Sequence, residues 1–85
     1  NYSKVGETNN FKYDFTQYLN GETITSYMTD DSNGVDLIST VQQTNTIIMN
    51  VKGVQAGTQS ITTTVTTNTG RVNPQKIYFQ VIDQG

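Results

Sequence analysis

Seven acidic residues are the side chains of this chain that could perform acid–base chemistry or bind a metal ion. Three of them, Asp30, Asp31 and Asp36, lie close together in the most polar stretch. A calcium loop of the helix–loop–helix type needs alternating oxygen ligands, a glycine at its sixth position and a glutamate at its twelfth, and this spacing lacks them. Neighbouring residues of an extended chain point in opposite directions, so Asp30 and Asp31 do not converge on one substrate atom. We expect a solvated turn, with weak calcium binding as the alternative.

The residue types that the chain lacks exclude several further kinds of chemistry. It contains no histidine, the commonest general base, and no cysteine, so it forms neither disulfides nor thiolate metal sites. Its five basic residues are scattered singly, which argues against a nucleic-acid footprint. No apolar run approaches the roughly 18 residues that a membrane-spanning helix needs. We therefore predict no enzyme activity, no catalytic or metal site, no cofactor, and no nucleic-acid or membrane partner.

Arg71 is the first candidate for a binding role, because it is the only arginine and follows Gly70 in a predicted turn. A guanidinium group forms paired, planar hydrogen bonds with a carboxylate, and arginine is over-represented at the energetic centres of protein interfaces. Arg71 can therefore bind an acidic group on a partner protein. The alternative interpretations are an ordinary solvated turn residue or an internal bond to a nearby acid such as Asp14.

Tyrosines are the other candidate binding residues. Tyr2, Tyr18, Tyr27 and Tyr78 are the aromatic residues that a core does not obviously need. A tyrosine ring stacks on an apolar surface or a sugar while its hydroxyl bonds outward. We take Tyr2, Tyr27 and Tyr78 as candidate partner contacts, with a protein or a carbohydrate as the partner. A chain without tryptophan offers only a weak sugar platform.

The elements that position these residues are predicted to be β-strands, most clearly in two β-rich runs, 59–67 and 75–82. Side chains alternate with a period of two along a strand, so each run has one apolar and one polar face. The apolar faces contain Ile61 and Val65 in the first run, and Ile77, Phe79 and Val81 in the second. Together the two runs predict an antiparallel pair that covers one side of a core.

The clearest alternation of all lies in residues 10–15, where Phe11, Tyr13 and Phe15 share one face. Three aromatic rings bury a large area, so we expect this face to point inward. The strand then breaks, and we expect Tyr18 and Leu19 to form one helical turn that caps the end of the core.

Another strand is predicted over residues 22–29. Its alternation puts Ile24, Ser26 and Met28 on one face and Tyr27 on the other. We expect the first of these faces to point inward, with Ile24 and Met28 in the core.

The middle of the chain is less regular. The Asn33-Gly34 dipeptide predicts a primed two-residue turn, because both positions accept a positive φ. Residues 34–44 then predict a short strand and an irregular crossing, and residues 45–51 a stronger strand. The glycines and alanine of residues 52–58 indicate a connection that crosses from one sheet to another.

About seven short strands separated by turn signals, with no helical periodicity over ten residues, are typical of an all-β, immunoglobulin-like Greek-key β-sandwich. We expect residues 1–9 to form a polar arm or edge strand and residues 10–83 the sandwich domain. The start without methionine indicates a processed chain or a segment of a longer one. The expected core consists of Phe11, Tyr13, Phe15, Leu19, Ile24, Met28, Leu37, Ile47, Met49, Val51, Ile61, Val65, Ile77, Phe79 and Val81.

Four short motifs, at residues 13–15, 18–24, 56–58 and 65–71, make the chain resemble the small immunoglobulin-like domains of tailed-phage virion proteins. The phage fiber–tail adaptors show the same order of an aromatic-Asp-Phe strand, an Asp-Thr-Ile strand, an Ala-Gly-Thr corner and a Thr-Thr-x-x-Gly-Arg turn. Gln59 replaces the corner tyrosine that often follows the Ala-Gly-Thr motif in that family, and its amide can still donate to a backbone carbonyl.

The resemblance implies a structural or interaction role in a phage particle, as an adaptor, decoration or spike component without catalytic residues. The partners would be capsid, portal or tail proteins, with a homo-oligomer as a further possibility, and the location would be the virion. The alternatives from the residues are a carbohydrate-binding or adhesin module, and a spacer repeat of a larger surface protein.

Overall fold

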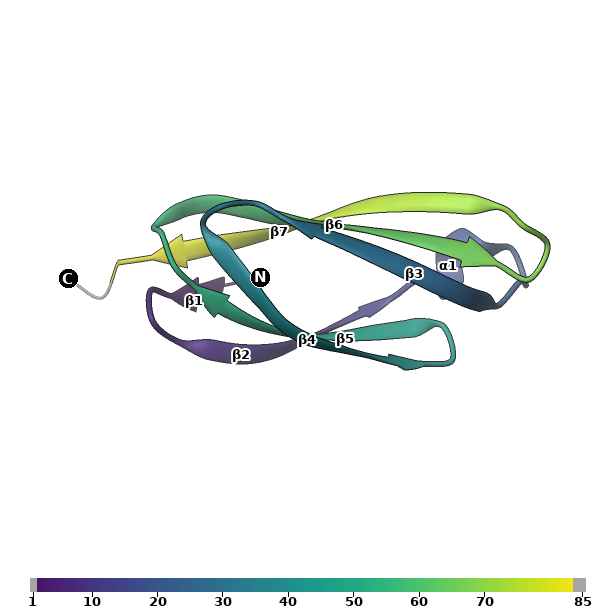
Figure 1. The fold of residues 1–85 in the computed structure, drawn as a ribbon, viewed down its shortest axis with the longest axis horizontal. Coiled ribbons are helices and arrows are strands. Elements are labelled where there is room, and N and C mark those ends of the chain that lie inside the picture. The colour runs from purple at the N-terminus through teal and green to yellow at the C-terminus, as the bar shows by residue number, and fades with distance from the viewer. Residues whose placement is uncertain (1, 84–85) are drawn as a thin grey trace.

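Seven strands and one short helix form the part of the chain that the structure, a computed structural model, describes: residues 2–83 (Figure 1). The elements are β1 (Tyr2–Lys4), β2 (Thr8–Asp14), α1 (Thr16–Leu19), β3 (Ile24–Asp31), β4 (Val35–Gln43), β5 (Thr46–Gly53), β6 (Gly57–Thr67) and β7 (Val72–Ile82). They form a four-stranded sheet in the order β1-β7-β6-β3 and a three-stranded sheet in the order β2-β5-β4. The predicted all-β sandwich of about seven strands is confirmed.

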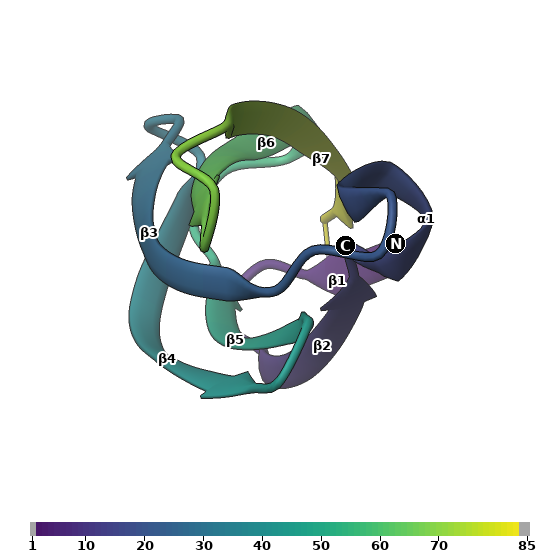
Figure 2. The same cartoon turned by 90° about the vertical axis from the view of Figure 1, so that its right-hand side faces the viewer.

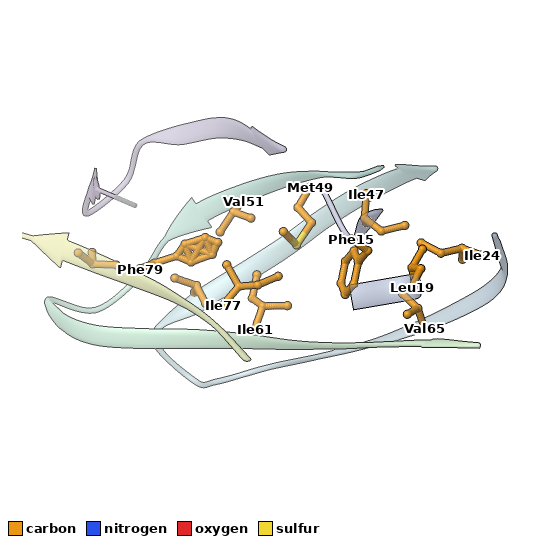
Figure 3. Packing of buried hydrophobic residues seen from close by; sticks show 12 residues of the cluster. Phe15, Leu19, Ile24, Ile47, Met49, Val51, Ile61, Val65, Ile77 and Phe79 are labelled. Atoms are coloured by element: carbon orange, nitrogen blue, oxygen red, sulfur yellow. The ribbon is translucent and has the colours of Figure 1, made fainter. Parts of the chain in front are cut away.

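The predicted strand pair near the end of the chain is also confirmed, as the antiparallel pair of β6 and β7. Their register runs from Gly57 opposite Val81 to Thr66 opposite Val72. The predicted apolar positions point inward and are fully or almost fully buried, namely Ile61, Val65, Ile77, Phe79 and Val81. Figure 3 shows Ile61, Val65, Ile77 and Phe79 on the side of the core that faces Val51, Met49 and Ile47 of β5.

The predicted crossing between sheets after β5 is confirmed, because residues 54–56 lead from the three-stranded to the four-stranded sheet. The primed turn predicted at Asn33-Gly34 is wrong, since neither residue has a positive φ. A primed turn joins neighbouring strands of one sheet, whereas β3 and β4 belong to different sheets. The glycine at position 34 gives space to a side chain instead: a Cβ there would overlap the side-chain amide of Gln59, which would have to move.

Met28 is not in the core, contrary to the prediction. The register of β3 against β6 shifts between Ile24 and Ser26, which is a β-bulge. A bulge adds one residue to the strand and reverses the inward and outward sense of the side chains beyond it. Ile24 is therefore buried, whereas Met28 is 76% exposed and Tyr27 faces the core instead.

A second bulge replaces the irregular crossing predicted after residue 34. Residues 35–43 form one strand, β4, whose register against β5 shifts between Leu37 and Ser39. The extra residue, Ile38, is exposed, while Val35, which we did not place in the core, is 1% exposed. Leu37 is partly buried against the core, as are Phe11 and Tyr13.

The edges of β3 and β4 lie side by side without backbone pairing, as the view along the long axis shows (Figure 2). Side chains bridge them instead: Gln42 Nε2 donates to Ile24 O at 3.0 Å, Tyr27 and Thr40 hydroxyls meet at 2.7 Å, and Leu37 N donates to Asp31 Oδ2 at 3.1 Å. Open strand edges are sites of unwanted pairing, and these bonds occupy two backbone groups of β3 and β4, Ile24 O and Leu37 N.

The predicted helical turn is confirmed as α1, which closes the end of the molecule where β6 turns into β7 (Figures 1 and 2). Asp14 Oδ1 accepts bonds from Thr16 N and Thr16 Oγ1 at 2.9 and 2.6 Å, which begin the turn and lower the pKa of Asp14. Leu19 is fully buried, and Asn20 ends the helix with φ 53°. Left-handed conformations of this kind suit asparagine and stop helices.

The contrast between Leu19 and Met28 gives a direct test of the core. We expect Leu19→Ala to lower the free energy of unfolding by roughly 2–5 kcal/mol, because it leaves a cavity at a fully buried position. Met28→Ala should change it by less than about 0.5 kcal/mol, because this side chain is exposed. Urea unfolding at low protein concentration measures both. A large loss for Met28→Ala would contradict the bulged register.

A pH-dependent change is expected from the two tyrosines beside α1. The rings of Tyr13 and Tyr18 are stacked, with their hydroxyls 3.4 Å apart. The contact with the Tyr18 hydroxyl, and then burial, raise the pKa of Tyr13 from 10.0 to about 12. Its stabilising effect is thus complete below pH 10 and lost as the pH rises towards 12.

Urea unfolding across this alkaline range measures the loss, with Tyr18→Phe as the matched control. Without the Tyr18 hydroxyl, the folded-state pKa of Tyr13 falls back towards its ordinary value and the alkaline loss becomes smaller. Equal losses in both proteins would show that the hydroxyl contact is not their cause.

Candidate interaction surface

One surface combines exposed apolar side chains with two of the predicted site residues. It is the solvent side of the four-stranded sheet, and we call it the outer face. It consists of the even-numbered residues of β1, β6 and β7, and of β3 beyond its bulge, which are Tyr2, Lys4, Ser26, Met28, Asp30, Thr58, Ser60, Thr62, Thr64, Thr66, Val72, Pro74, Lys76, Tyr78, Gln80 and Ile82. Their odd-numbered neighbours point towards the core, because side chains alternate along a strand.

Apolar groups gather on this face. Among residues 2–83, eight large hydrophobic side chains are exposed, and five of them belong to the outer face: Tyr2, Met28, Val72, Tyr78 and Ile82. Ile38, Val41 and Val54 lie elsewhere. Single exposed apolar residues are normal, and the presence of several on one face makes it a candidate interaction surface.

The middle of the outer face is a row of small hydroxyl side chains. β6 lies between β3 and β7 in the sheet, and its outward residues include Thr62, Thr64 and Thr66, all half-buried. Threonine is β-branched and stiff, so the row needs little ordering when another surface packs against it. The row therefore forms a low, rigid centre with the larger apolar groups on both sides.

Two opposite charges flank this centre in one cross-strand row. Asp30 of β3 is opposite Thr62 of β6, which in turn is opposite Lys76 of β7. Lys76 Nζ lies 5.8 Å from the centroid of the Tyr78 ring, a cation–π contact within the face. The outer face is thus neither purely apolar nor of a single charge.

The structure separates the predicted tyrosines into two pairs. Tyr2 and Tyr78 both lie on the outer face, on the neighbouring strands β1 and β7. Tyr27 and Tyr18 are partly buried against the core, and the Tyr27 hydroxyl bonds to Thr40. Tyr27 is therefore not part of an exposed aromatic platform.

Arg71 forms an internal ion pair, although not with the acid that we named. Its Nη1 lies 3.5 Å from Glu22 Oε2, while half of the arginine side chain remains exposed. Arg71 N also donates to Thr67 Oγ1 at 3.2 Å. The Thr67 hydroxyl lowers the pKa of Glu22, with smaller contributions from Thr69 and Arg71, and burial opposes them.

Asparagines that sequence analysis missed hold this end together. Asn68 N donates to Thr23 O at 2.9 Å, and Thr23 N donates to Asn68 Oδ1 at 3.2 Å. Asn45 Oδ1 accepts from Ile24 N at 3.2 Å, and Asn45 Nδ2 donates to Glu22 O at 3.3 Å. The motifs at 18–24 and 65–71 are therefore in direct contact, and their polar residues bind each other.

Gln59 makes the bond expected of it, because its Nε2 donates to the carbonyl of Gln55 at 3.3 Å. Its Oε1 accepts a bond from the Ser32 hydroxyl at 3.1 Å, and Ser32 Oγ in turn accepts from Ser60 N at 3.0 Å. This side chain thus joins the β3–β4 connection to the start of β6, and its amide lies against Gly34, where a Cβ would displace it.

The remaining hollows offer little chemistry. The larger one, about 370 Å³ beside α1, is lined by Asp14, Thr16 and Gln17, and this set contains a single carboxylate. Acid–base catalysis needs two titratable groups with separated pKa values. Within the described residues, no three His, Cys, Asp or Glu side chains lie close enough to bind a metal ion. No helix in residues 2–83 is long and apolar enough to cross a membrane.

Comparisons with known proteins bear on the fold. No protein-family model matches the chain, and no curated protein matches it in sequence. Among solved structures, the solution structure of the PKD domain from KIAA 1837 protein is similar, with a TM-score of 0.59 and 19% identity over 99% of this chain and 81% of that domain. A PKD domain is immunoglobulin-like, so the likeness supports an immunoglobulin-like β-sandwich. At this identity it shows the fold alone.

The polar contacts at the α1 end give a test of which residues act within the fold. We expect Asn45→Ala to lower the free energy of unfolding by roughly 1–3 kcal/mol, because it removes two partly buried bonds. Arg71→Ala should cost less than about 1 kcal/mol, because a half-exposed ion pair is screened by solvent. Chemical denaturation of both variants measures the difference. Equal losses would mean that the Arg71–Glu22 pair is as important as the asparagine bridge.

Proposed function

We propose that this chain is a non-enzymatic structural module that binds other proteins through its outer face. The observation that supports this most strongly is the gathering of five of the eight exposed large hydrophobic residues on that face. Its apolar flanks provide area to bury, and its threonine centre is small enough to allow close approach. Side-chain bonds bridge the edges of β3 and β4, which makes these edges less suited to strand pairing with a partner than the outer face is to packing.

We further propose that the module belongs to the particle of a tailed phage, as an adaptor, decoration or spike component that contacts capsid, portal or tail proteins. This proposal rests on the sequence motifs of the resemblance. It names no particular partner.

A sugar-binding surface is the second candidate. Tyr2 and Tyr78 are 77% and 56% exposed on neighbouring strands of one face, as an aromatic platform requires. Lys76 occupies a position over the Tyr78 ring, which reduces the ring surface that a sugar can use. We therefore favour protein binding.

Substitution with a charge tests the proposed face. We expect Val72→Asp to weaken association with the virion proteins of its own particle roughly tenfold or more, because an unpaired carboxylate would be buried in an apolar contact. Val41→Asp is the matched control: Val41 is similarly exposed, but on the solvent side of the three-stranded sheet. Co-sedimentation with capsid, portal and tail fractions measures both.

Equal weakening by both substitutions, or by neither, would contradict a role for the outer face. Binding to a glycan array that disappears in Tyr78→Ala and persists in Val72→Asp would instead support the sugar-binding candidate. Circular dichroism spectra that match the unsubstituted chain would show that each variant is folded.

A further inference from the structure

We infer that the protein bound on the outer face is a second copy of this chain, packed face to face about a twofold axis that runs close to the direction of β6. This inference rests on the proposed function: the outer face pairs two copies, and loss of the pair weakens association with the particle because two linked copies bind more tightly than one. Two properties of the face support it: the arrangement of its charges and the shapes of the side chains in the row beside them.

The charges are self-complementary under this rotation. Asp30, Thr62 and Lys76 occupy one row across β3, β6 and β7. The acid and the amine lie on opposite sides of β6, each about one strand spacing of 4.8 Å from it. A half-turn about an axis along β6, in the plane between two facing sheets, exchanges the two sides. Asp30 of each copy then faces Lys76 of the other, and a twofold interface contains both pairs.

These charges are available because neither forms a salt bridge with another described residue. Among residues 2–83, the salt bridge is that of Arg71 with Glu22, at the end of the molecule. Lys76 contacts the Tyr78 ring, and Asp30 is exposed on β3. An interface that provided no opposite charge would have to desolvate both groups at a cost.

One neighbouring row also fits a second copy. It contains Met28, Thr64 and Pro74, so the same half-turn sets the apolar Met28 against the apolar Pro74 of the second copy. On the axis, Thr64 meets Thr64, and two small side chains allow the sheets to approach to the roughly 10 Å of face-to-face packing. In this row, apolar groups thus meet apolar groups on both sides of the axis.

The three-stranded sheet lacks this self-complementarity. Its middle strand is β5, and Lys52 points outward from it between Thr8 of β2 and Asp36 of β4. A half-turn about β5 would place Lys52 against Lys52 of the second copy. Like charges facing each other oppose association, so the outer face of the four-stranded sheet is the one that suits a twofold dimer.

The area suits only a weak, concentration-dependent dimer. β3 pairs with β6 over residues 61–67, or about 23 Å at 3.3 Å per residue, and three overlapping strands are about 14 Å wide. The three-strand overlap is thus roughly 300 Å² from each copy and about 600 Å² in total, which is smaller than most stable interfaces. The dimer should therefore dissociate on dilution.

Zero-length carbodiimide cross-linking provides the test, because it joins a carboxylate to an amine only where the two are in contact. We expect the unsubstituted chain to give a covalent dimer whose linked peptide joins Asp30 to Lys76. Asp30→Asn alone and Lys76→Gln alone should each lose this linkage. An equal mixture of the two variants should regain part of it, because a mixed dimer retains one of the two Asp30–Lys76 pairs.

Lys52→Gln, on the other sheet, is the matched control and should cross-link as the unsubstituted chain does. Light scattering across a concentration range should show a monomer–dimer equilibrium that Asp30→Asn shifts towards the monomer. A chain that stays monomeric at every concentration, or a mixture that regains no linkage, would overturn the inference.

The two proposals fail in distinguishable ways. If no dimer forms while Val72→Asp still weakens co-sedimentation with the virion proteins, the outer face binds a different protein and only the second copy is excluded. If Val72→Asp affects neither dimer nor co-sedimentation, the face itself is excluded and both proposals fail.

Discussion

The structure depends most on the long antiparallel pairing of β6 and β7. Ten paired positions, from Gly57 with Val81 to Thr66 with Val72, set which side chains of both strands point inward. Five of the twelve core residues come from this pair, and its flanks pair with β1 and β3. A one-residue slip would move every one of these side chains to the opposite face, so the burial of a core without disulfides holds the register in place. The same register assigns the even-numbered residues to the outer face.

Two bulges adapt the remaining strands to this frame. The register shifts in β3 and β4 each reverse which side chains of the strand point inward. As a result, Tyr27 and Thr40 face each other between the two sheets, and Met28 and Ile38 face solvent. Edge strands with free backbone groups invite pairing with other chains, and side-chain bonds across the β3–β4 boundary occupy two of these groups. A partner of β3 then contacts the side chains on its solvent side. The bulges thus contribute to the surface that we propose for binding.

The residues that suggested a family from the sequence act mainly within the fold. Asn68 and Thr23 bind each other, Arg71 pairs with Glu22, and Gln59 bonds to Gln55 and Ser32. Sequence motifs that join the ends of strands can therefore be shared by domains whose partners differ. The candidate binding residues lie instead between the motifs, at alternate positions of plain strands such as Val72, Lys76 and Tyr78. The sequence already suggested Tyr78, but the strand register is needed to add Val72 and Lys76 to the same face.

The sequence alone determined the features that depend on local chemistry. The alternation in residues 59–81 was enough to predict the β6–β7 pair and its buried face. Tyr18 and Leu19 were enough to predict the helical turn, and residues 52–58 were enough to predict the crossing between sheets. Tertiary structure decided the orientation of Met28, the conformation of Asn33-Gly34 and the ion-pair partner of Arg71. A bulge forms only against a partner strand, a turn type follows from the sheets that it joins, and an ion pair needs residues 49 positions apart to meet. These three outcomes are set by neighbours that are distant in the sequence, whereas alternation and turn chemistry are set by adjacent residues.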